Sequence, residues 1–229
     1  MKKLIRGIVE FRRNVQDSYR KSFGPLARGQ APDALLIACS DSRVVPNVFA
    51  STNPGDLFVS RNIGNIVPPH GVFMGGDSEA AIIEFSVLRL NVLDIIVCGH
   101  SECGAMQALI NGRKNIETPA LKNWLRHGDP ALDLLNSGVV LDSSLEKHNQ
   151  LSQINVLTQI EHIKTYPIVK RRIKEGRLAI HGWWFDIAEA DVYYYDEAIR
   201  KFIMINEAEA ENILNNFDMN NTGCVNCYS

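Results

Sequence analysis

Two short motifs in this sequence combine cysteine, histidine and charged residues in a pattern that is typical of a metal site. Cys39, Asp41 and Arg43 alternate with serines in the first motif, and His100 and Cys103 form the second. Two thiolates and one imidazole suit Zn²⁺. Structural zinc sites close with four protein ligands, whereas catalytic sites keep three and leave one position open. The ligands Cys39, His100 and Cys103 therefore predict one catalytic zinc ion per chain.

Asp41 is the nearby residue that could close this site as a fourth ligand. Arg43 lies two positions away, and a carboxylate that is paired with an arginine is held ionised and in place. We therefore expect Asp41 to leave the metal open and to accept a hydrogen bond from the attacking nucleophile.

Both motifs follow short apolar segments. Residues 34–38 precede the first motif and residues 95–98 precede the second, and both segments are typical of buried parallel strands. Open α/β sheets bind their ligands at the carboxyl ends of such strands, which is where both motifs lie. Cys98 lies inside its apolar segment, so we interpret it as a core thiol rather than a ligand.

The remaining pattern predicts an α/β fold with a mostly parallel central sheet flanked by helices, an N-terminal helical arm and a C-terminal strand and hairpin. Apolar residues from Leu4 to Val15 recur at helical spacing, and Ser143 with Glu146 fits a capping box before a long helix. The other predicted elements are a strand over 57–60, helices over 78–90 and from Cys103, a long helix with apolar residues 151–163, a helix over 167–176, and strands over 178–185 and 192–195.

Length and composition favour a single globular domain over residues 1–229, with residues 1–25 as the arm and 218–229 as a loose tail. The 45% of hydrophobic residues suffice for a sizeable core. A net charge of −2 argues against a general nucleic-acid or membrane-surface binder. Charged residues interrupt the N-terminal apolar segment, and the cysteines suggest a reducing compartment, so we expect a cytoplasmic protein.

The chain resembles the β class of carbonic anhydrases from about Gln30 to Asp196. The resemblance rests on four segments in family order: Cys39-x-Asp-x-Arg43, Gly55-Asp-Leu-Phe-Val-x-Arg-Asn-x-Gly-Asn65, His100-x-x-Cys-Gly104 and His181-Gly-Trp183. It implies zinc on Cys39, His100 and Cys103, and a zinc lyase that interconverts carbon dioxide and bicarbonate. It also implies a homodimer or homotetramer with active sites at subunit interfaces.

The resemblance further assigns roles to residues outside the two motifs. Phe58, Ile63 and Phe85 match the positions that wall the substrate pocket, and they form an apolar group suited to CO₂. Gln30 and the backbone N–H of Gly104 are then expected to stabilise the developing bicarbonate oxygens, while Asp41 orients the nucleophile.

Gln30 also stands at the spacing of the plant-type branch of this family. The other branch carries a tryptophan three residues before the first cysteine, where this chain has Leu36. We therefore expect an open site with an Arg-paired Asp41 at neutral pH. Phe85 departs from the tyrosine common in plant-type relatives. The charge of Glu102, between the ligands, could tune the site or simply face water, and we favour the second interpretation. His70 is interpreted as a solvated loop histidine rather than a proton shuttle.

Three other functions stay open. The same site could hydrolyse a related linear molecule such as carbonyl sulfide or carbon disulfide. A structural zinc module would need only the ligands, although Asp41, Arg43 and Gln30 argue against it. Cys224 and Cys227 form a C-x-x-C pair that could be a thiol switch or half of a zinc ribbon, but the Asn-rich surroundings favour a disordered tail.

Overall fold

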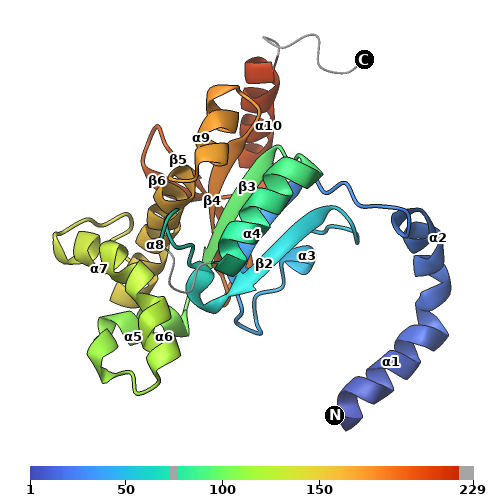
Figure 1. Ribbon diagram of the computed structural model, residues 1–229, viewed down its shortest axis with the longest axis horizontal. Coiled ribbons are helices and arrows are strands. Elements are labelled where there is room, and N and C mark those ends of the chain that lie inside the picture. The colour runs from blue at the N-terminus through green and yellow to red at the C-terminus, as the bar shows by residue number, and fades with distance from the viewer. Residues whose placement is uncertain (73–76, 222–229) are drawn as a thin grey trace.

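A six-stranded sheet forms the centre of the molecule (Figure 1). The computed structural model describes residues 1–72 and 77–221. The strand order is β2-β1-β3-β4-β5-β6, in which the first four strands are parallel and the last two antiparallel. The strands are β1 (Ala34–Cys39), β2 (Leu57–Asn62), β3 (Asp94–His100), β4 (Ala179–Asp186), β5 (Asp191–Asp196) and β6 (Lys201–Met204). This confirms the predicted α/β fold.

The apolar sequences of β1 and β3 place these strands in the middle of the sheet. Every residue of β1 is buried, and β3 is buried from Ile95 onward, as expected for parallel strands that are covered on both faces. The polar residues at the carboxyl end of β2 suit its place at the edge of the sheet.

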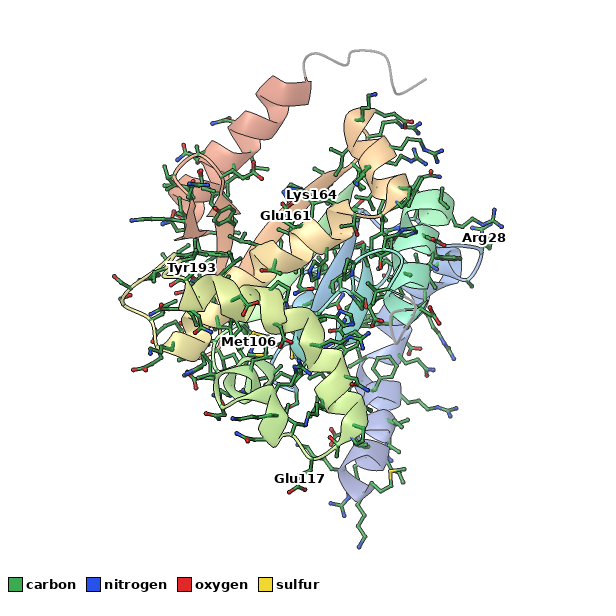
Figure 2. All side chains as sticks on the ribbon, turned by 60° about the vertical axis from the view of Figure 1, so that its left-hand side comes forward. Arg28, Met106, Glu117, Glu161, Lys164 and Tyr193 are labelled. Atoms are coloured by element: carbon green, nitrogen blue, oxygen red, sulfur yellow. The ribbon has the colours of Figure 1, made fainter. Side chains whose placement is uncertain are left out.

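One face of the sheet is covered by three helices that enclose a shared hydrophobic core. They are α4 (Asp77–Phe85), which continues into a π-helical turn at Ser86–Leu90, α8 (Lys147–Lys164) and α9 (Pro167–Lys174). α8 packs across β3 and β4, and its outer side carries the Glu161–Lys164 ion pair at 2.8 Å (Figure 2).

A second core lies beside the carboxyl end of the sheet and contains Cys39, Cys103 and Met106 (Figure 2). The helices around it are α5 (Gly104–Ile110), α6 (Pro119–Leu125) and α7 (Asp129–Asn136), which pack against α8 or its neighbours. This helical group therefore surrounds the residues of the two motifs.

The opposite face of the sheet is more sparsely covered. A short helix, α3 (Pro46–Phe49), lies there, and Phe49 stacks on Phe185 of β4 with ring centroids 4.9 Å apart. The N-terminal arm consists of α1 (Lys2–Asn14) and α2 (Gln16–Leu26), which project away from the sheet (Figure 1). Neither helix buries a residue, so the arm has a large apolar surface without cover within the described chain.

The capping box predicted at Ser143 and Glu146 is wrong. α8 begins at Lys147, and its N-cap residue Glu146 makes no side-chain capping bond. Instead, Asp142 Oδ1 accepts hydrogen bonds from the backbone N–H and the hydroxyl of Ser144, and this local turn keeps the chain out of the helix.

The C-terminal region contains elements that the sequence pattern did not reveal. β6 extends the sheet, and α10 (Glu207–Asn221) follows it. Residues 218–221 of the predicted loose tail therefore belong to a helix, whereas Cys224 and Cys227 lie outside the described residues. Within the described ranges, no helix combines the length and apolar character needed to cross a membrane.

We predict that Gly99→Ala lowers the free energy of unfolding by about 1–3 kcal/mol, because overpacking a core has this cost. A Cβ at Gly99 would lie 2.7 Å from Val156 Cγ2 and 3.2 Å from the backbone oxygen of Ser152, both on α8. Chemical denaturation measures the effect. Gly24→Ala is the matched control, since a Cβ there meets nothing within 4 Å. Equal losses in both variants would contradict the close packing of α8 on β3.

Candidate active site

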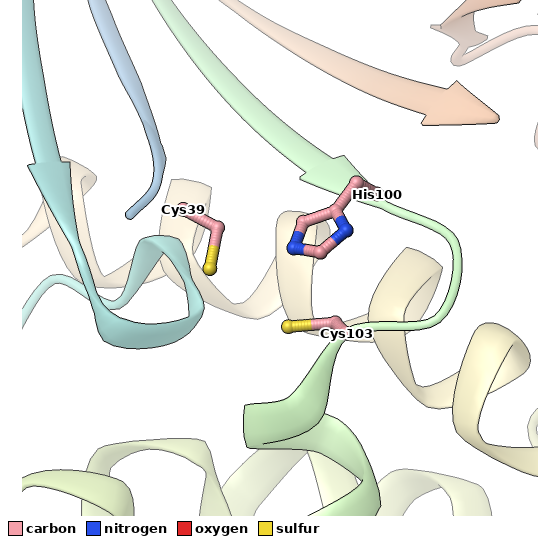
Figure 3. A group of neighbouring side chains, drawn as sticks. All are labelled: Cys39, His100 and Cys103. Atoms are coloured by element: carbon pink, nitrogen blue, oxygen red, sulfur yellow. The ribbon is translucent and has the colours of Figure 1, made fainter. Parts of the chain in front are cut away.

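The three predicted metal ligands converge in the structure (Figure 3). Cys39 ends β1 and His100 ends β3, and these strands are parallel neighbours, so both side chains leave the sheet at the same edge. Cys103 lies directly before α5. All three residues are buried, and their ligand atoms lie within 4.8 Å of one another.

The imidazole of His100 is oriented for metal binding. His100 Nδ1 lies 2.7 Å from the backbone oxygen of Ser101, a contact in which Nδ1 carries the hydrogen and donates it. The other ring nitrogen, Nε2, is then an unprotonated donor atom for a metal. It is buried and has no hydrogen-bond partner within the described chain. A metal ion bound to Nε2 would explain why this buried polar atom lacks a hydrogen-bond partner.

The hydrogen bond between the two thiols shifts their pKa values in opposite directions. The pKa of Cys39 is lowered to about 4, chiefly by the hydrogen bond with Cys103, although burial opposes the shift. The same hydrogen bond, together with burial, raises the pKa of Cys103. A bound cation favours both thiolates, because metal binding displaces protons from its ligands. The donor set and the free His100 Nε2 therefore fit Zn²⁺.

Gly64 supports Cys39 from the loop after β2. Its backbone N–H donates to Cys39 Sγ at 3.3 Å, and its φ of 80° is a conformation that favours glycine. A Cβ at this position would lie 2.9 Å from the Cβ of Ala105 in α5. Glycine at this position thus permits both the turn and the close contact with α5.

Asp41 and Arg43 form the predicted pair. Arg43 Nε donates to Asp41 Oδ1 at 2.9 Å and Nη2 donates to Oδ2 at 2.8 Å, which is a bidentate arrangement. These hydrogen bonds hold the pKa of the Asp41 carboxyl well below its usual range, against the effect of burial. The metal-ligand group of the described residues contains Cys39, His100 and Cys103 but not Asp41.

Arg61 is a site residue whose role the sequence motifs did not reveal. Its guanidinium donates to the backbone oxygen of Cys39 at 2.9 and 3.0 Å and to that of Asp41 at 2.6 Å. It therefore fixes the backbone that carries the first ligand and the carboxylate. Its position within the 55–65 segment of the family motif was the available signal, but the contact partners were not visible in the sequence.

The predicted pocket residues Phe58, Ile63 and Phe85 lie on β2, directly after β2 and at the end of α4, and are partly exposed to solvent. Phe58 and Phe85 contact each other with ring centroids 5.8 Å apart. Phe85 is 44% exposed and Ile63 is 45% exposed. Ile63 also lines a cavity of about 800 Å³ that includes Ser40, the residue after the first ligand, and its backbone oxygen accepts a hydrogen bond from Trp124 Nε1.

Two further predicted residues are accessible. Gly104 is the exposed first residue of α5, next to the ligand Cys103, and Gln30 is exposed in the segment between α2 and β1. Their roles toward substrate stay predictions.

The interpretation of Cys98 agrees with the structure, because burial raises the pKa of its thiol to about 12. His70 is exposed in its loop, where its backbone N–H donates to Thr165 Oγ1 at 2.8 Å. Glu102 is exposed as well, but the interpretation that it simply faces water is wrong. Its carboxylate accepts hydrogen bonds from His148 Nε2 at 2.9 Å and from Asn149 Nδ2 at 3.0 Å.

Known proteins resemble this chain over most of its length. A family model described as "Carbonic anhydrase" matches residues 34–192. The chain is 42% identical over 207 residues to a carbonic anhydrase of Pseudomonas aeruginosa, covering 90% of this chain and 93% of that protein. It is 40% identical over 203 residues to carbonic anhydrase 1 of Escherichia coli O157:H7, covering 89% and 91%.

Solved structures show the same relationship. The β-carbonic anhydrase CcaA has a TM-score of 0.82 at 39% identity, covering 90% of this chain and 92% of that one. One of two β-carbonic anhydrases from Sordaria macrospora, described as tetrameric, has a TM-score of 0.72 at 29% identity, covering 85% and 97%. The sequence and the fold match those of β-carbonic anhydrases along most of the chain, and the Cys39–His100–Cys103 group is present. The chain therefore belongs to the carbonic anhydrase family, in its β class.

Proposed function

We propose that this protein catalyses the reversible hydration of carbon dioxide to bicarbonate and a proton, with one Zn²⁺ held by Cys39, His100 and Cys103. The observation that carries the proposal is the combination of three converging ligand atoms with a nearby carboxylate that Arg43 occupies. Three protein ligands leave a position for water or substrate. A purely structural zinc site has no use for the Asp41–Arg43 pair.

Zn²⁺ held by Cys39, His100 and Cys103 would supply Lewis acidity, which would lower the pKa of water toward about 7 and so provide a nucleophile near neutral pH. The chain supplies orientation. Asp41, held ionised by Arg43, accepts a hydrogen bond from the attacking water and directs its lone pair at the carbon of CO₂. Gln30 and the N–H of Gly104 donate hydrogen bonds to the oxygens that gain charge as bicarbonate forms. Phe58, Ile63 and Phe85 bind the apolar substrate.

We also propose that the pocket is completed by a second subunit, in a homodimer or homotetramer. The half-exposed Ile63 and Phe85 need cover before they can exclude water. The arm presents an apolar surface as well, since Leu4 is 65% exposed and Ile8 is 67% exposed. Isologous dimers are the commonest way to bury such surfaces. The tetrameric β-carbonic anhydrase named among the similar structures supports an oligomer.

Two finer assignments belong to the same proposal. Leu36, where the other branch has a tryptophan, supports a plant-type site with an open metal position. The buried reduced thiols Cys39, Cys98 and Cys103 support a reducing compartment, and we place the protein in the cytoplasm. Hydrolysis of carbonyl sulfide or carbon disulfide receives no support from the relatives, which are named carbonic anhydrases. Turnover of CO₂ measured beside turnover of those gases tests the choice.

Replacing either cysteine ligand is expected to remove the metal. Cys39→Ser and Cys103→Ser should each lose most of the zinc that the wild-type chain binds at one equivalent, because a serine hydroxyl is a far weaker zinc ligand than a thiolate. Metal analysis of the purified proteins measures this. Cys98→Ala is the matched control, since Cys98 is a buried cysteine of β3 outside the ligand group. Full zinc in either ligand variant would refute the assignment.

Asp41→Asn should keep its zinc and lose CO₂ hydration by roughly 10²–10³-fold, the usual cost of removing one well-placed polar group at such a site. The amide cannot pair with Arg43 as the carboxylate does. Stopped-flow hydration assays on zinc-loaded protein give the rate. Asp33→Asn, an exposed change just before β1, serves as the control and should retain the wild-type rate. Unchanged turnover in Asp41→Asn would leave the zinc assignment standing but remove this mechanism.

Deletion of residues 1–26 is expected to weaken association and activity together, because it removes the apolar arm that a second subunit covers. Neither arm helix buries a residue within the described chain, so the domain should still fold and show a cooperative melt. Light scattering measures the mass, and a hydration assay is run on the same sample. A strictly monomeric truncated protein with the full rate would show that each chain completes its own site.

A further inference from the structure

The turn between His100 and Cys103 contains a residue in an unfavourable conformation. Glu102 has a φ of 56°, in the left-handed region that glycine adopts freely and that a side chain with a Cβ rarely adopts. Contacts with neighbouring residues must therefore hold the backbone of Glu102 in this conformation. Ser101, on one side of it, is anchored by a 2.9 Å hydrogen bond from its N–H to the backbone oxygen of Phe185.

Asn149, near the start of α8, holds Glu102 through both atoms of its side-chain amide. Its Oδ1 accepts the backbone N–H of Glu102 at 2.8 Å, and its Nδ2 donates to Glu102 Oε1 at 3.0 Å. Asn149 is only 7% exposed, and both hydrogen bonds are part-buried. They restrain the backbone and the side chain of Glu102 at the same time.

The backbone of Glu102, which Asn149 holds at its N–H, in turn contacts the catalytic pair through its carbonyl. The backbone oxygen of Glu102 accepts a hydrogen bond from Arg43 Nη2 at 3.1 Å. The same Nη2 donates to Asp41 Oδ2 at 2.8 Å. The direction of the Glu102 carbonyl therefore helps to determine where the guanidinium lies, and the guanidinium determines where the Asp41 carboxylate points.

We propose that Asn149 is a positioning residue for the hydration reaction, acting on Asp41 through the backbone of Glu102 and through Arg43. This inference rests on the proposed function for the identity of the reaction, but the chain of contacts is independent of it. The four residues come from three separate parts of the sequence. Only the packing of α8 beside the turn after β3 brings them together.

Asn149 also lies in the first turn of α8, so its loss could act merely by disturbing the start of that helix. The neighbouring residue Gln150 separates the two effects. Gln150 Nε2 donates to the backbone oxygen of Leu145 at 2.6 Å, which is a contact at the start of α8 that does not involve Glu102. Gln150→Ala is therefore the control for a structural effect.

The experiment compares Asn149→Ala with Gln150→Ala as zinc-loaded full-length proteins. We expect Asn149→Ala to keep its zinc and to lose kcat/KM by roughly ten- to a hundredfold, since small displacements of catalytic groups have effects of this size. Gln150→Ala should have a similar melting temperature and the wild-type rate. Equal activity in the two variants would overturn the proposal.

Two double variants test whether Asn149 acts on the rate through Glu102 and Asp41. In Asp41→Asn, adding Asn149→Ala should lower the rate little further, because the positioned group is already gone; a full additional loss would overturn the proposal. In Asn149→Ala, adding Glu102→Gly should restore most of the activity, because glycine adopts the left-handed conformation without a clamp. If the rate does not recover, the backbone of Glu102 does not connect Asn149 with Arg43.

A structural readout makes the test independent of the reaction. Asn149→Asp with Glu102→Gln reverses the side-chain hydrogen bond at nearly constant volume and should keep the Arg43–Glu102 contact in a crystal structure. Asn149→Ala should lose this contact, and an unchanged contact would overturn the proposal. Wild-type protein without CO₂ hydration would refute the proposed function alone, and the crystal structures would still decide the role of Asn149.

Discussion

The parallel pairing of β1 with β3 is the constraint on which the site depends. Residues Ala34 to Ala38 pair in register with Asp94 to Cys98, so the last residues of the two strands, Cys39 and His100, emerge at one edge of the sheet. Cys39 and His100, far apart in the sequence, thereby become neighbours in a buried environment. Cys103 joins them because the chain turns within two residues after β3 and enters α5. A slip of one residue would send either ligand to the other face.

Positive side chains control the charge distribution around this group. Arg43 holds Asp41 ionised and away from the metal ligands, while Arg61 binds the backbone oxygens of Cys39 and Asp41. The two arginines therefore have different tasks, since one orients a side chain and the other fixes the strand end. This arrangement supports the proposed site, in which a metal position stays open and a carboxylate lies beside it.

Buried polar side chains of α8 hold the backbone of the loops around the site. Ser152 Oγ donates to the backbone oxygen of His100 at 2.8 Å, and Asn155 Nδ2 donates to that of Gly64 at 3.0 Å. Asn149 holds the turn between the ligands in the opposite sense, because its Oδ1 accepts the backbone N–H of Glu102. The apolar positions of 151–163 predicted this helix, but the buried polar side chains between them are what satisfy the loops around the site.

The sequence by itself determined the ligand set, the Asp41–Arg43 pair and the alternation of strands and helices, because these depend on residue type and local spacing. The capping box at Ser143 was wrong because Asp142 forms a local turn with Ser144 and α8 begins only at Lys147, a choice that the local sequence pattern does not resolve. The roles of Arg61, Asn149 and Ser152 were decided only by tertiary structure, since each acts on a backbone group distant in sequence. Hydrogen bonds to backbone atoms carry no residue-type signature, so only the packed fold reveals them.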